Sequence, residues 1–179
     1  DNQKRPYAFS VQPFLVDAKL SQQGFATSEP FSIEKGGIKP VVFLLADHGF
    51  DAYSTLIETR RNLVEKKPDL VQRFVDASAI GWYHYIYGDS RPGNELIKKQ
   101  NPEMTDALLS YSIAKMKEYG IVDSGDSVKL GIGAMTDAHW KSFFDKMVRA
   151  GVVKGGLDYK RAYTLQFVNQ SVGIDLRPK

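Results

Sequence analysis

The chain contains no cysteine, and this absence excludes several kinds of chemistry at once. Disulfide bridges, catalytic thiolates and zinc sites built on cysteine all need a thiol that the 179 residues do not supply. The absence is compatible with an oxidising periplasm, where a stray thiol would be a hazard, although it does not fix the compartment.

Long apolar runs and nucleotide-binding signatures are absent as well. No stretch reaches the roughly 18–20 apolar residues of a membrane span. The sequence holds no Gly-Lys-Ser/Thr loop, no Gly-x-Ser-x-Gly motif and no histidine pair of the HExxH kind. The 24 basic and 21 acidic residues are interleaved, with basic runs no longer than pairs such as Arg60 and Arg61. We therefore expect no metal, no cofactor and no nucleic-acid partner.

Short stretches with the composition of β-strands are present, mostly in the first third of the chain. The run from Pro40 to Ala46 is continuously apolar and begins with β-branched valines, which is typical of a strand buried on both faces. Pro30 is expected to end the first strand, because proline cannot donate to a sheet ladder. Strands are predicted over residues 24–27, 40–46, 53–59 and 164–168.

The remaining two thirds of the chain are predicted to be mostly helical. After Pro68, apolar side chains recur at three- and four-residue spacing as far as Ile86, and Gly88 closes the pattern. This predicts an amphipathic helix of about five turns. Asn101 and Thr136 are expected as N-caps of two later helices. Shorter helices are predicted over residues 13–21, 101–120, 136–151 and 158–163.

The order of these elements bears on the fold class. A few strands come first and a run of helices follows. The predicted strands are too few to form a sheet of ordinary size. We therefore expect a helix-rich α/β chain that forms the tail of a larger α/β fold. The polar and charged start of the sequence indicates that any targeting segment has been removed or lies outside it.

The densest polar cluster lies at residues 22–30 and supplies four candidate ligand-binding residues. In open α/β sheets, ligands bind in crevices outside the carboxyl ends of strands. A carboxylate there can accept two charge-assisted N–H bonds from an amino-heterocycle. The alternative is that Ser28 and Glu29 only cap the turn into residues 31–34. The candidates are Gln23, Thr27, Ser28 and Glu29.

A second candidate region follows the apolar run. Asp47 and His48 lie in a predicted turn between two strands, where loop residues often contact ligands. Tyr53 could stack on a ligand ring, because an aromatic side chain offers a flat apolar face with a polar tip. The alternative is an ordinary turn with Tyr53 in the core. His84 and His139 are expected to be packing or surface residues, and no catalytic residue is assigned.

Several short motifs occur in a fixed order along the chain. They include Gln22-Gln23-Gly24 leading to Glu29-Pro30, and a helix in which a proline and an acid follow a short basic stretch. The stretches are residues 22–30, 63–71, 101–104, 119–122 and 143–147. Each motif is moderately specific, but in this order they resemble the solute-binding proteins of ABC importers for nitrate, sulfonate, taurine and thiamine precursors.

The resemblance implies the C-terminal part of a type II periplasmic-binding-protein-like fold, in which two α/β lobes close on a ligand. Residues 1–46 would be the end of the second lobe, 47–59 the crossover or hinge, and 60–179 a helical return that packs on the first lobe. An N-terminal part of the same protein would be missing, and with it half of the ligand cleft.

The function implied is that of a non-enzymatic periplasmic protein, or an extracellular, membrane-anchored one in a Gram-positive bacterium. It would capture a small solute and deliver it to the transmembrane subunits of an ABC permease. Glu29 favours an amine or aminopyrimidine, such as a thiamine precursor, over a sulfonate or nitrate. Two alternatives stay open: an enzyme similar to the fungal thiamine pyrimidine synthases, and a partner-docking or oligomerising fragment that does not bind ligand by itself.

Overall fold

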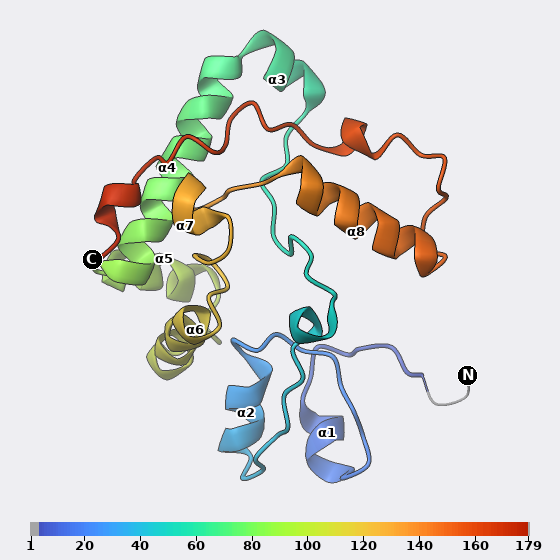
Figure 1. Ribbon diagram of the computed structural model, residues 1–179. Coiled ribbons are helices and arrows are strands. Elements are labelled where there is room, and N and C mark those ends of the chain that lie inside the picture. The colour runs from blue at the N-terminus through green and yellow to red at the C-terminus, as the bar shows by residue number, and fades with distance from the viewer. Residues whose placement is uncertain (1–3, 179) are drawn as a thin grey trace. The chain divides into compact units, whose positions relative to one another are not determined.

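The computed structural model describes residues 4–178, and these form helices joined by loops, with no β-strand among them (Figure 1). No helix in this part of the chain is both long and apolar enough to cross a membrane. In chain order the helices are α1 Gln12–Val16, α2 Glu29–Lys35, η1 Leu45–His48, α3 Arg61–Lys66, α4 Pro68–Tyr87, α5 Arg91–Gln100, α6 Asp106–Glu118, α7 Ser127–Leu130, α8 Asp137–Arg149, η2 Tyr159–Ala162 and η3 Ile174–Leu176.

The four predicted strands are wrong. The apolar run at 40–46 is irregular until it enters η1, and Val41 and Val42 are 77% and 41% exposed. A strand needs a neighbouring strand to take its backbone hydrogen bonds, and residues 4–178 supply none. Despite their β-prone composition, residues 24–27, 40–44, 53–59 and 164–168 form loops and turns, and residues 45–46 belong to η1.

The fold class is accordingly confirmed only in part. The chain is helix-rich, as expected, and the α/β class is not confirmed because the described residues contain no sheet. The division of the chain at residues 46 and 59 into lobe, hinge and return segments stays a prediction.

The helix predictions are confirmed where a capping residue and a periodic apolar pattern both indicate a helix. Helix α4 begins at Pro68 and ends before Gly88, as predicted. Thr136 caps α8, with its Oγ1 accepting a bond of 3.2 Å from the backbone N–H of His139. The short helices predicted near residues 13–21 and 158–163 are present as α1 and η2, shorter than expected.

Two details of the helix predictions are wrong. Asn101 forms a local turn, in which its Oδ1 accepts from the backbone N–H of Glu103, and Thr105 caps α6 instead. Helix α5 has no predicted counterpart. Pro92 and Gly93 in its first turn suggest a loop by composition, but a proline is tolerated there because its N–H is not needed.

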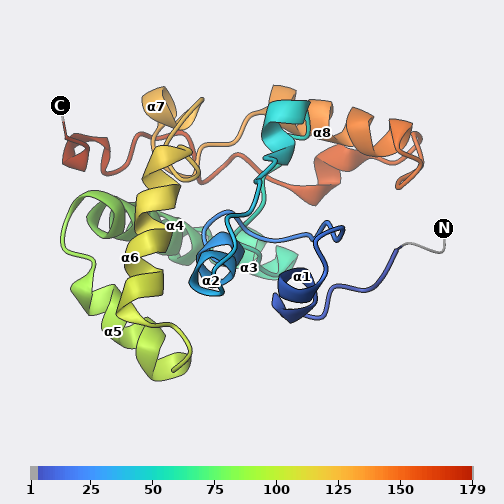
Figure 2. The same cartoon turned by 90° about the horizontal axis from the view of Figure 1, so that it is seen from below.

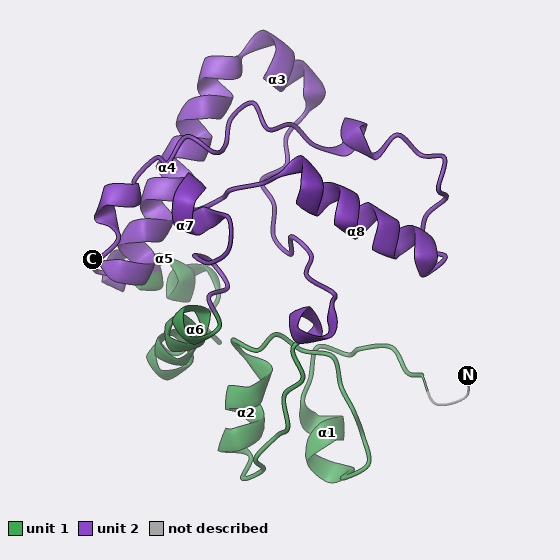
Figure 3. Ribbon diagram, viewed as in Figure 1, with its two compact units in different colours: residues 1–44, 94–119 green, residues 45–93, 120–179 purple. Residues whose placement is uncertain are grey.

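The chain divides into two compact units, coloured separately in Figure 3. Unit 1 comprises residues 4–44 and 94–119 of the described chain. In this unit the Ser112 hydroxyl, on α6, donates a bond of 2.7 Å to the carbonyl oxygen of Thr27. Phe31 and Tyr111 pack with ring centroids 5.3 Å apart. These contacts fix the start of α2, the helix that carries Glu29, against α6.

Helix α2 also has a well-defined end. The backbone N–H of Ile38 donates to the Ile33 carbonyl, and that of Gly37 donates to Glu34. This pair of bonds forms a Schellman motif and requires a left-handed residue, which Gly37 provides with φ of +85°. The sequence thereby defines both ends of the seven-residue helix.

Unit 2 comprises residues 45–93 and 120–178 and has α4 as its longest helix. One face of α4 buries Val71, Ala79, Tyr83 and Ile86, at the spacing expected of an amphipathic helix. The C-terminal segment lies along α4, and Figures 1 and 2 both place η3 beside it.

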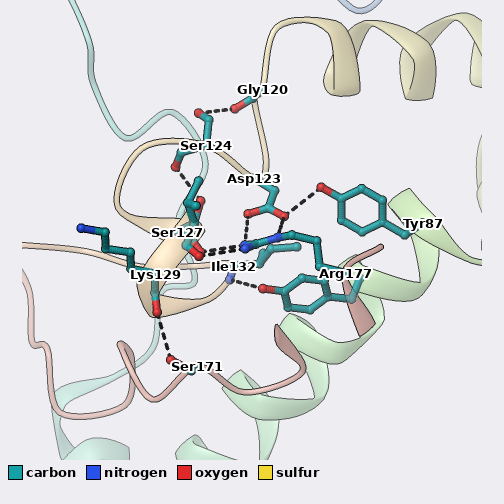
Figure 4. A network of polar contacts seen from close by, with 11 residues as sticks. Tyr87, Gly120, Asp123, Ser124, Ser127, Lys129, Ile132, Ser171 and Arg177 are labelled. Atoms are coloured by element: carbon teal, nitrogen blue, oxygen red, sulfur yellow. Dashed lines mark hydrogen bonds and ion pairs between the residues drawn. The ribbon is translucent and has the colours of Figure 1, made fainter. Parts of the chain in front are cut away.

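A network of polar contacts fastens this C-terminal segment (Figure 4). Arg177 donates to the two carboxylate oxygens of Asp123 at 2.7 and 2.6 Å, and also to the carbonyl oxygens of Ser127 and Val128. The Tyr87 hydroxyl donates to the same carboxylate at 2.8 Å. The side chain of Asp123 is only 4% exposed, so its charge is neutralised inside the unit.

Candidate functional site

Glu29 is the centre of the polar cluster in unit 1. A turn at residues 26–28 leads into α2, with Ser28 at the N-cap position and Glu29 as the first helical residue. The Tyr7 hydroxyl donates to Oε1 of Glu29 at 2.5 Å. The Ser28 hydroxyl and the backbone N–H of Phe25 donate to Oε2 at 2.5 and 2.7 Å. The carboxylate therefore closes the turn between Phe25 and Glu29 and also binds Tyr7 in the N-terminal segment.

The donors around Glu29 keep it ionised. Partial burial acts to raise the pKa of Glu29, but hydrogen bonds from Ser28, Tyr7 and the backbone amides of Phe25 and Glu29 outweigh burial and lower that pKa below its ordinary value. The same contact acts on its partner, since the bond to Glu29, with some desolvation, raises the pKa of Tyr7 to about 12. At neutral pH the cluster is thus a carboxylate held by a neutral phenol.

All donors to Glu29 in this cluster are neutral, which matters for what the site can do. A carboxylate offers about four lone-pair positions. Tyr7 uses one on Oε1, Ser28 and the Phe25 amide use two on Oε2, and the backbone amide of Glu29 also acts on the carboxylate. Acceptance of two bonds from one ligand, as the sequence suggested, would require Tyr7 or Ser28 to give up its bond.

The other two predicted residues of this cluster are placed differently. Gln23 is exposed, in the irregular segment before the turn. Thr27 is half-buried and takes part through its backbone carbonyl, which accepts from Ser112. The neighbouring Gln22 has a buried amide nitrogen with no partner among the described residues. Ser28 and Glu29 are therefore the two predicted residues that the structure joins by a direct bond.

The remaining predicted residues belong to unit 2. Asp47 and His48 lie in η1 and are exposed. Tyr53 is half-buried, and its hydroxyl accepts a bond of 3.0 Å from the backbone N–H of Thr136. Its ring stacks on His139 at 4.2 Å and packs against Trp140 at 5.4 Å. Tyr53 thus packs on α8, and its contact with a ligand stays a prediction.

The aromatic cluster at α8 extends beyond Tyr53. Trp140 stacks on Tyr163 with ring centroids 4.6 Å apart and planes 5° apart. His139 contacts the backbone carbonyl of Asp51 through Nε2 at 2.6 Å, so that nitrogen carries the proton. The prediction that His139 is a packing residue agrees with these contacts.

Sequence reasoning missed Tyr7, the third member of the Glu29 cluster. Tyr7 is 22 residues from Glu29, and no spacing pattern connects them. Within residues 4–178 no group of three or more His, Asp or Glu side chains could hold a metal ion. The arrangement around Glu29 supports binding of a hydrogen-bond donor or a cation.

Comparison with known proteins gives one match. Residues 9–89 match the family model described as NMT1/THI5 like, whereas no curated protein and no solved structure matches the chain. The matched range includes the Glu29 cluster apart from Tyr7 and runs from α1 through α4, but it leaves out the resembling stretches at 101–104, 119–122 and 143–147. Over that range the chain is similar to NMT1/THI5-like domains, which indicates a solute-binding or thiamine-precursor-related role.

Proposed function

We propose that this chain is part of the solute-binding component of an ABC-type importer. In this proposal it captures a small solute in the periplasm, or at the outer face of a Gram-positive cell, and delivers it to the transmembrane subunits of the permease. The observation that carries the proposal is the NMT1/THI5-like match over residues 9–89, which contains the ionised Glu29.

The charge of Glu29 decides the class of solute in this proposal. The groups that donate to it are neutral, so the negative charge is solvated but not cancelled. A sulfonate or nitrate would be repelled by that charge, whereas an amine or an aminopyrimidine would donate to the carboxylate. We therefore propose an amino-heterocycle, such as a thiamine precursor, as the solute.

The proposal includes a second wall for the solute. The family resemblance implies an N-terminal part of the same protein that faces this chain across a cleft. Exposed apolar side chains at Val41 and Phe43, which are 77% and 73% exposed, are of the kind that such a part would cover. A non-enzymatic role is part of the same proposal.

One other candidate function has a specific observation in its favour. Helix α4 exposes the side chains of Phe74 and Trp82, at 60% and 40%. Exposed aromatic side chains on a helix are typical of partner-docking surfaces. A concentration-dependent change in mass by sedimentation velocity that is lost in Phe74→Ser would favour a docking role.

Calorimetry on the full-length protein tests the proposed function. We expect 4-aminopyrimidine to bind and nitrate and taurine not to compete. Glu29→Gln should weaken binding of 4-aminopyrimidine by tenfold or more, since a charge-assisted bond contributes about 1.5–3 kcal/mol. The matched control is Glu34→Gln on the same helix, which should leave affinity unchanged. Equal affinity in Glu29→Gln and the unmodified protein would remove Glu29 from the site.

An enzymatic role is tested separately. A role similar to the thiamine pyrimidine synthases would require conversion of bound substrate. We expect mass spectrometry of a sample incubated with pyridoxal phosphate to show no product and no covalent change. Appearance of a pyrimidine product would support the enzyme instead of the binding protein.

A further inference from the structure

Three cations in unit 2 line an open hollow at α3. The hollow has a volume of about 610 Å³, within the range of small-ligand pockets. The side chains of these three cations take part in no ion pair or hydrogen bond among residues 4–178. The residues that line the hollow are Glu58, Thr59, Arg60, Asn62, Leu63, Lys66 and Lys67.

The local backbone explains why these side chains meet. Arg60 is extended, with φ of −72° and ψ of 139°, and the chain then turns into the six residues of α3. On this helix Asn62 and Lys66 are four residues apart and share a face, and Lys67 follows as its C-cap residue. The backbone N–H of Lys67 donates to the Leu63 carbonyl at 2.9 Å and fixes the end of the turn. Both ends of the segment 58–67 therefore border one hollow.

The charge around the hollow is positive. Arg60, Lys66 and Lys67 outnumber the single acid Glu58 among the lining residues. Arg61 lies next to them and donates to the backbone carbonyl of Arg161 at 3.4 Å, which brings a second basic segment near α3. By contrast, α6 and α8 pair Lys115 with Glu118 and Lys141 with Asp145.

We propose that the hollow at α3 binds a phosphate group, carried by a phosphate monoester or by inorganic phosphate. The excess of two positive charges over Glu58 matches a phosphate dianion better than a single carboxylate. The planar guanidinium of Arg60 can contact two phosphate oxygens at once, and lysine ammonium groups act as point charges beside it. Thr59 and Asn62 add side-chain donors, and half-buried Leu63 gives an apolar floor. This site is independent of Glu29 and of the proposed transport role.

Titration with inorganic phosphate, followed by ¹⁵N–¹H NMR, tests the site in the full chain. We expect saturable shifts of backbone amides that are confined to residues 58–67. The double variant Lys66→Gln with Lys67→Gln should weaken phosphate binding about tenfold, because two charge-assisted contacts are lost from an exposed site. The matched control, Lys129→Gln with Lys154→Gln, removes two exposed, unpaired lysines elsewhere in unit 2 and should change the affinity less than twofold.

The source of the phosphate group is separated by a second measurement. Vesicles of phosphatidylcholine with phosphatidic acid, compared with vesicles of phosphatidylcholine alone, show whether a lipid headgroup is bound. Sedimentation with the phosphatidic acid vesicles that is lost in the double variant would indicate a headgroup, and phosphate binding without sedimentation a soluble ligand. Absence of both kinds of binding, or equal weakening in the control variant, would overturn the site. Neither outcome depends on binding of 4-aminopyrimidine at Glu29.

Discussion

Asp123 in unit 2 and Glu29 in unit 1 each collect several hydrogen-bond donors, but the donors differ in charge. Asp123 receives a guanidinium through both oxygens, with a tyrosine hydroxyl beside it. Glu29 receives two hydroxyls and a backbone amide. Asp123 is therefore a neutralised group inside the unit, while Glu29 keeps an uncancelled negative charge.

This difference separates a structural carboxylate from a candidate binding carboxylate. A buried ion pair that is fully hydrogen-bonded has nothing left to offer a ligand, and its removal leaves an uncompensated charge. A carboxylate held in place by neutral donors is positioned without being satisfied electrostatically. Such a group can attract an amine, which is the basis of the role proposed for Glu29.

The largest effect is expected from breaking the neutralised pair. Arg177→Ala removes the cation and leaves Asp123, with a side chain only 4% exposed, without its counter-charge. We expect the free energy of unfolding of unit 2 to fall by about 3 kcal/mol, in the range measured for broken buried pairs. Urea denaturation followed by tryptophan fluorescence measures this, because both Trp82 and Trp140 lie in unit 2.

A second arginine provides the control for this prediction. Arg91 makes a comparable ion pair with Asp89 at 2.8 Å, but the two side chains are 86% and 51% exposed. Solvent screens such a pair, so Arg91→Ala should leave the urea midpoint unchanged. If both variants unfold at the midpoint of the unmodified protein, Asp123 is not the buried anchor described above.

The same contrast shows what the sequence could predict about the fold. Helix α4 and the capped start of α8 depend on neighbouring residues, such as Pro68, Gly88 and Thr136, so local patterns suffice. A strand depends on a partner from elsewhere in the chain. The valines at 41 and 42 have strand-forming side chains, but no partner is present in residues 4–178 and no strand forms. Composition alone could not reveal this.

The candidate site divides in the same way. Ser28 and Glu29 are adjacent, and the sequence predicts them either as ligand-binding residues or as caps of the turn into residues 31–34. In the structure Ser28 occupies the N-cap position of α2 without a side-chain capping bond, and its hydroxyl donates to Glu29. Tyr7 reaches Glu29 across 22 residues and Arg177 reaches Asp123 across 54, so neither contact leaves a local signal. Long-range polar contacts of this kind follow from tertiary packing, and single-sequence reasoning does not recover them.

A smaller effect is expected from removing one neutral donor from Glu29. Tyr7→Phe deletes the hydroxyl that donates to Oε1 and keeps the ring. We expect the free energy of unfolding of unit 1 to fall by about 1 kcal/mol, less than for a fully buried bond to a charge because the site is partly open to solvent. Hydrogen exchange of the α2 amides measures this.

The matched control is Tyr159→Phe. Its ring stacks on Phe144 at 4.8 Å, and its hydroxyl makes no hydrogen bond within the described residues. This variant should leave hydrogen exchange unchanged throughout α2. Equal protection of α2 in Tyr7→Phe and in the unmodified protein would mean that the Tyr7 bond does not hold the cluster in solution.

The smallest effect is expected from protonation of Glu29 at low pH. Protonation removes only the part of the cluster's stability that depends on the charge of the carboxylate. Burial acts to raise the pKa of Glu29, but its hydrogen bonds outweigh burial, so folding lowers this pKa. The unfolded state therefore binds the proton more tightly than the folded state. The stability that the carboxylate contributes is fully present above its unfolded pKa of 4.5 and is lost as pH falls through the lower pKa of the folded state.

Hydrogen exchange of α2 compares the stabilities of the unmodified protein and Glu29→Gln. The two stabilities should differ by a constant amount at neutral pH and converge below the folded-state pKa of Glu29. In a Tyr7→Phe background the convergence should begin at a higher pH, since one of the bonds that lower the pKa is gone. A difference that stays constant into strong acid would show that the charge of Glu29 contributes nothing to folding, and the contrast with Asp123 would then rest on burial alone.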